Sequence, residues 1–109
     1  AEGDRVVCID RGIAAAEASG EYIGVARFNA VAVAWLQAHH KRVKKNFTGQ
    51  IWRDGTGFEK AYLIHLLQEM IEAGERMVHV DTPGGYIEVD TQQDFDYARK
   101  YWTAKHLGR

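Results

Sequence analysis

The segment at residues 84–96 constrains the fold most, because an extended stretch runs directly into a helix start. Residues 86–90 carry aromatic and β-branched side chains, which favour a β-strand, and the polar residues that follow favour a helix N-terminus. Side chains two residues apart on a strand share a face, so Glu88 and Asp90 are expected to point the same way at the strand end. Two carboxylates beside a helix N-terminus have the ligand chemistry of a magnesium and phosphate site.

The rest of the chain alternates between short apolar runs and longer helical patterns. The apolar runs predict further strands at residues 6–9, 22–28 and 77–80. The longer patterns predict helices at residues 30–45 with Asn29 as N-cap, at residues 58–73 with Gly74 as the terminating glycine, and at residues 91–106. Thr56 and Glu59 have the spacing of a capping box for the second helix. The alternation predicts an α/β fold, in which residues 1–109 form one small domain with a short mixed sheet and about three helices.

The composition limits the classes of function. Hydrophobic residues make up 46% of the chain, which is enough to build one core. The 14 basic and 15 acidic residues give a net charge of −1, so no overall field attracts nucleic acid. No apolar run approaches the roughly 18 residues that a membrane span needs, and Cys8 is the single cysteine. We therefore expect a cytoplasmic protein with no internal disulfide, no nucleic-acid partner and no membrane partner.

Two motifs in a fixed order carry a resemblance to a known family. Residues 20–28 read Gly-Glu-Tyr-Ile-Gly-Val-Ala-Arg-Phe, and residues 86–94 read Tyr-Ile-Glu-Val-Asp-Thr-Gln-Gln-Asp. Together they resemble the C-terminal half of sugar-1-phosphate and phosphocholine or phosphonate nucleotidyltransferases, over about residues 6–102. The resemblance implies a GT-A-like fold. It also assigns roles to five residues, with Asp90 and Glu88 as metal ligands and Glu21, Gly24 and Arg27 as part of the substrate site.

The reaction implied by this resemblance is nucleotidyl transfer. An acceptor phosphate or phosphonate attacks the α-phosphorus of a nucleoside triphosphate, expected to be CTP, and pyrophosphate leaves. Mg²⁺ is the implied cofactor, and a nucleotide or a phosphorylated small molecule is the implied ligand. The family's glycine-rich triphosphate loop and its first metal aspartate have no counterpart in these 109 residues. The chain is therefore expected to be inactive without a complementary N-terminal half.

The missing half leads to an expectation about assembly. Without it, apolar surface and strand edges are left uncovered, and residues 58–73 are apolar around more than one face. We expect the chain to pair with a second copy about a two-fold axis, as a homodimer. The alternative function is a stand-alone oligomeric module for binding or assembly, without catalysis.

Simpler structural interpretations stay open for each candidate residue. Asp90 or its neighbour Thr91 would cap the last helix, and Glu88 would lie on a solvated strand face. Glu21 and Arg27 would form an ordinary surface ion pair. Gly24 would mark a bulge instead of the close approach of a ligand. Outside these motifs, His65 is expected to be a core histidine of its apolar helix, and residues 41–45 a solvated basic helix end.

Overall fold

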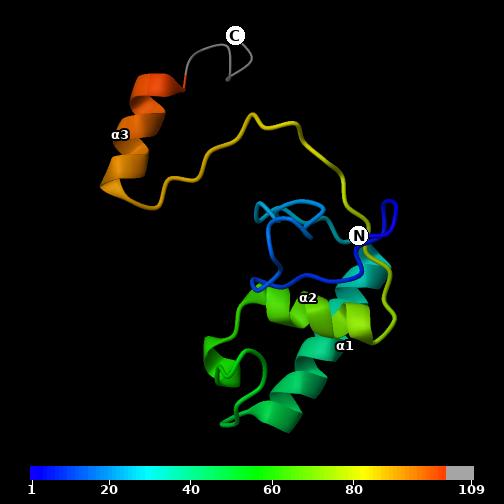
Figure 1. The fold of residues 1–109 in the computed structure, drawn as a ribbon. Helices are drawn as coiled ribbons and strands as arrows, with labels where there is room; N and C mark the ends of the chain where they lie inside the picture. Colours follow the sequence, from blue (N-terminus) through cyan, green and yellow to red (C-terminus); the bar gives the residue numbers. More distant parts are fainter. Residues whose placement is uncertain (103–109) are drawn as a thin grey trace.

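The computed structural model describes residues 1–102 and is helical in that range (Figure 1). In chain order the elements are α1 (Ala30–Phe47), a short 3₁₀ turn η1 (Phe58–Lys60), α2 (Leu63–Glu72) and α3 (Gln92–Tyr101). Among them only α1 and α2 pack extensively, while α3 stands apart at the end of a long extended segment (Figure 1). The radius of gyration is 16.9 Å, against about 13 Å for a compact chain of this length. The described chain is therefore a small helical body, residues 1–79, with a protruding arm, residues 80–102.

Helix α1 begins where the sequence predicted. The side chain of Asn29 accepts a hydrogen bond from the Ala32 amide at 2.8 Å, so Asn29 is the N-cap. Lys44 and Lys45 lie in the last turn, where positive charge interacts favourably with the helix dipole. Val43 is fully buried against the body. Neither α1 nor any other helix within residues 1–102 combines the length and the apolar composition that crossing a bilayer requires.

Helix α2 ends as predicted but begins later. The predicted capping box of Thr56 and Glu59 is wrong, because the Glu59 carboxylate accepts a hydrogen bond from the Gly49 amide at 2.8 Å. The chain makes one 3₁₀ turn there, and α2 starts only at Leu63. At the other end Gly74 has φ +95°, and the next amide bonds back to the Met70 carbonyl at 3.0 Å. This is the glycine-terminated helix end that the sequence indicated.

The hydrophobic core is built mainly from one face of α2. Leu66, Leu67 and Met70 are buried there, with Met70 only 1% exposed. Partly buried apolar side chains from the rest of the body pack around them, namely Ile9, Phe28, Leu36, Trp52 and Met77. Every member of this cluster precedes residue 78, so the core belongs to the body and includes nothing from the arm.

The predicted α/β fold with its mixed sheet is wrong for residues 1–102, where no strand or sheet forms. Segments 4–6 and 77–79 make a single antiparallel bridge, with two backbone hydrogen bonds of 2.9 and 2.8 Å. The predicted strands at 22–28 and 86–90 make no backbone hydrogen bond to another segment in the described part of the chain. A strand is stable only when a neighbour completes its ladder. Because segments 22–28 and 86–90 have no such neighbour, they are irregular despite the β-propensity of their residues.

Hydrogen bonds within its own first turn fix where α3 begins. Thr91 and Asp94 form a capping box: the Thr91 hydroxyl accepts from the Asp94 amide at 3.1 Å, and the Asp94 carboxylate accepts from the Thr91 amide at 3.2 Å. None of the side chains of α3 is buried. The predicted helix was longer, and its last residues, 103–106, lie outside the described part of the chain.

Candidate functional site

The negative charges of three carboxylates help to raise the pKa of the Tyr86 hydroxyl. The pKa of Tyr86 is raised, first by partial desolvation and then by the negative charges of Glu88, Glu21 and Asp90. Glu21 belongs to the motif at residues 20–28, and the other three belong to the second motif. Charges from both motifs therefore influence Tyr86, and we call Glu21, Tyr86, Glu88 and Asp90 the acidic cluster.

The sequence analysis had not identified Tyr86 as a site residue. The signal that could have found it is the two-residue periodicity of an extended chain, in which Tyr86, Glu88 and Asp90 share a face. Residues 86–90 form no strand in the described structure, so the common direction of the Glu88 and Asp90 side chains stays a prediction.

The side chain of Asp90 is available for a ligand. The helix cap that competed for it is Thr91, whose hydroxyl accepts the Asp94 amide. Asp90 contributes only its backbone amide, which donates to the Asp94 carboxylate at 3.1 Å. Within residues 1–102 the Asp90 carboxylate makes no hydrogen bond or ion pair. The capping interpretation is thus confirmed for Thr91 and does not occupy Asp90.

The acidic cluster fits magnesium by chemistry but not as a complete cage. Hard carboxylate oxygens suit Mg²⁺, which commonly takes one or two carboxylates and fills its shell with phosphate oxygens and water. In the described range, no group of three or more His, Cys, Asp or Glu side chains is close enough to hold a metal ion. The ligands present therefore fit a site that substrate and water complete.

Arg27 lies at the N-terminal end of α1, two residues before its N-cap. It is exposed and makes no ion pair with any residue in the range 1–102, so the alternative interpretation of Arg27 and Glu21 as a surface ion pair is wrong. The first turn of α1 holds no acidic side chain. A basic residue two positions before a helix N-cap has the charge to attract an anion such as phosphate.

Gly24 occupies a bend before Arg27, with φ +86°. A Cβ atom added there would meet nothing within 4 Å. Its positive φ is therefore the reason for glycine in this structure, because non-glycine residues are strained in that region.

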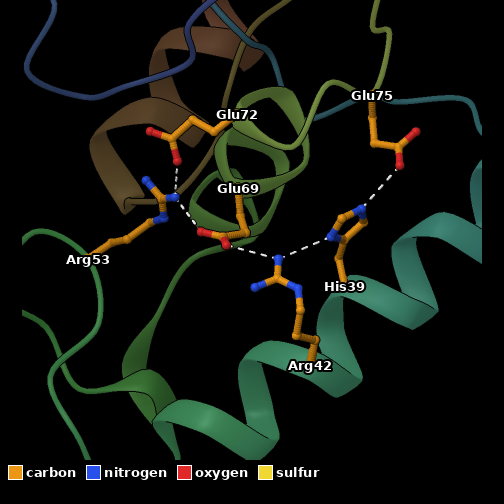
Figure 2. A network of polar contacts seen from close by, with 6 residues as sticks. All are labelled: His39, Arg42, Arg53, Glu69, Glu72 and Glu75. Carbon is orange, nitrogen blue, oxygen red and sulfur yellow. Dashed lines mark hydrogen bonds and ion pairs between the residues drawn. The ribbon is translucent and has the colours of Figure 1, made fainter.

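A network of polar contacts ties α1 to α2 and to the loop before α2 (Figure 2). In order, it joins Glu75, His39, Arg42, Glu69, Arg53 and Glu72. Glu69 accepts from Arg42 at 2.9 Å and also from Arg53. Burial by itself would raise the pKa of Glu69, but hydrogen bonds and charge from the two arginines outweigh it, and the pKa is lowered. The network links α1 to α2, and its charged side chains are paired with one another.

His65 is buried, as the sequence predicted, at 5% exposure. Its Nδ1 accepts from the Tyr62 amide at 3.1 Å, so its Nε2 carries the hydrogen and donates to Asp54 at 2.8 Å. Both ring nitrogens are therefore used within the fold. A cavity of about 110 Å³ lies beside this pair, lined by Ile9, Asp10, Arg53, Asp54, His65 and Gln68. With neither nitrogen free, His65 acts here as a structural group and not as a general base.

The chain was compared with protein-family models, with curated proteins and with solved structures, and none of the three comparisons gave a match.

Proposed function

We propose that this chain supplies the acceptor side and the metal carboxylates of a magnesium-dependent nucleotidyltransferase. The observation that carries the proposal is the acidic cluster, in which Glu21 from one motif lies in electrostatic range of Tyr86 together with Glu88 and Asp90 from the other. None of the four residues of the acidic cluster belongs to a strand in the described structure, so the cluster does not require a sheet. The order and spacing of the two motifs provide further support.

Each residue has a distinct role in this proposal. Asp90 would ligate the magnesium ion and Glu88 would support it, because both side chains are exposed and on one extended segment. Bound Mg²⁺ would neutralise charge that develops on the phosphates. Arg27, which lies just before the N-terminus of α1, would orient the acceptor phosphate or phosphonate for attack on the α-phosphorus of CTP. Gly24 sets the bend that places Arg27 relative to Glu21.

Metal binding gives the most direct test. We would follow the backbone amides by NMR while adding Mn²⁺ as a paramagnetic substitute for Mg²⁺, with and without CTP. The amides of residues 86–91 and Glu21 should broaden, and the effect should weaken in Asp90→Asn. Asp96→Asn is the matched control, because Asp96 lies in α3 outside the cluster. Broadening confined to residues 41–45, or equal broadening in both variants, would contradict the assignment.

Catalysis is expected to need a triphosphate-binding region that these 109 residues do not contain. Pyrophosphate release from CTP with phosphocholine or 2-aminoethylphosphonate should stay at background for the chain alone, because one carboxylate pair cannot orient a triphosphate. Turnover by the chain alone that disappears in Asp90→Asn would show that the two-part site is wrong. The exposed lone Cys8 supports a reducing, cytoplasmic setting.

A second candidate function is an oligomeric binding or assembly module. The observation that favours it is α3, an amphipathic helix with no buried side chain at the end of an extended arm. In that case Asp90→Asn would change neither metal binding nor assembly. The metal titration therefore separates the two candidates.

A further inference from the structure

An apolar groove lies on the body of the molecule, between the second half of α1 and the start of α2. Its volume is about 180 Å³, and a dry apolar cavity of about 150 Å³ is large enough to bind benzene. The lining is largely aromatic and aliphatic, made by His40, Trp52, Phe58, Ala61, Tyr62, Leu63 and Leu66. Tyr62 and Leu63 are still 56% and 50% exposed, so the groove is open to a side chain from outside.

Helix α3 presents the opposite situation, because it buries none of its own side chains in the described part of the chain. It is 10 residues long and buries no side chain, whereas isolated helices below about 12–15 residues are marginal in water. Phe95 is 49% exposed on this helix. A capping box alone is a small contribution, so α3 needs a surface to pack against.

The charges around the two features are complementary. Phe95 is flanked in the sequence by Asp94 and Asp96. On the groove side, Lys44 follows His40 by four residues of α1, which places it on the same helix face. Lys60 adjoins Ala61, a lining residue, at the other rim. The first half of α3 is therefore acidic, although the Asp94 carboxylate also caps the helix, and its charge is opposite to that of the two lysines beside the groove.

We propose that this groove receives Phe95 from α3 of a second copy of the chain. In the described structure α3 stands apart from α1 and α2, so it does not occupy the groove of its own chain (Figure 1). Two copies that exchange their α3 helices fill both grooves by the same contact, which closes a two-fold dimer. This inference goes beyond the proposed nucleotidyl transfer and does not depend on it.

The test measures mass by size exclusion with light scattering over a concentration series. The wild-type chain should have twice the 12.3 kDa of one copy at high micromolar concentration. Phe95→Ser and Leu63→Glu should each raise the dissociation constant at least about 10-fold, because each removes the apolar contact. Tyr97→Ser is the matched control, because Tyr97 is about 200° away from Phe95 around the same helix and 57% exposed. Circular dichroism checks that each variant keeps its helices.

Mixing the two variants separates exchange between copies from folding back within one copy. A mixture of Phe95→Ser and Leu63→Glu chains retains one intact helix–groove contact per pair, so it should form more dimer than either variant alone. A wild-type chain that stays at 12.3 kDa would overturn the proposal. So would a dimer that neither Phe95→Ser nor Leu63→Glu weakens, or a mixture that gains nothing.

Discussion

The body and the arm of this chain both contain capped helices, but only the helices of the body have neighbours that bury their side chains. In the body, α1 and α2 face each other and bury Val43, Leu67 and Met70 almost completely. In the arm, α3 has a capping box but buries none of its side chains. The difference shows that a cap defines where a helix begins, whereas apolar burial determines whether the helix contributes to a core.

The same contrast holds for polar groups. In the body, Glu69 is surrounded by arginines that lower its pKa. In the arm, Asp90 keeps a carboxylate with no hydrogen-bond partner in residues 1–102. Engaged charges stabilise the fold, and the free ones are the groups available to a ligand or a metal.

The largest effect is expected from removing core volume in the body. Met70→Ala should lower the free energy of unfolding by about 3 kcal/mol, because a side chain only 1% exposed leaves a cavity. Phe95→Ala in the arm should change the stability of the body by less than about 0.5 kcal/mol. Urea unfolding followed by tryptophan fluorescence at low protein concentration measures both. Equal losses would show that arm and body form one core.

The next largest effect is expected at the centre of the polar network. Glu69→Gln should cost about 2 kcal/mol, since it removes the charge that both Arg42 and Arg53 bind. Glu72→Gln is the comparison, because Glu72 pairs with one arginine, Arg53, and its side chain is 54% exposed; it should cost less than about 1 kcal/mol. The same urea titration applies. A neutral Glu69→Gln would mean that the helix pair is held by apolar contact alone.

A smaller and local effect is expected at the cap of α3. Thr91→Ala should destabilise α3 by about 1 kcal/mol, because the Asp94 amide loses its partner. At a protein concentration low enough to keep the chain monomeric, backbone chemical shifts of residues 92–101 would report the loss of helix, while those of α1 and α2 stay unchanged. Gln93→Ala, at an exposed position of the same helix, is the control. Shifts that spread into the body would contradict an independent arm.

The smallest effect is expected where the arm leaves the body, at His79. Hydrogen bonding to the Gly3 carbonyl and then to Asp81 raises the pKa of His79. A raised pKa in the folded state means that this contact contributes fully below the ordinary value of about 6.5 and is lost as the pH rises through the folded value. Amide exchange of residues 4–6 should therefore quicken as the pH rises above neutral, beyond its intrinsic pH dependence. His79→Gln should abolish that excess, and an excess that persists would point to another group.

The sequence by itself determined the features that depend on neighbours a few residues apart. Asn29 caps α1, Gly74 ends α2 and Thr91 opens α3, because each uses a side chain or a φ angle within its own turn. His65 was also predicted as a buried residue, from the apolar helix around it.

Tertiary structure decided the features that need partners from elsewhere in the chain. The predicted sheet failed because segments 22–28 and 86–90 found no ladder partner among the described residues. The start of α2 moved because the distant Gly49 amide took the Glu59 carboxylate. The influence of Glu21 on the pKa of Tyr86 and the polar network on Glu69 likewise depend on residues that are distant in the sequence. Local hydrogen bonds are selected by a few adjacent residues, whereas ladders, ion networks and cores form only where folding brings the second partner within reach.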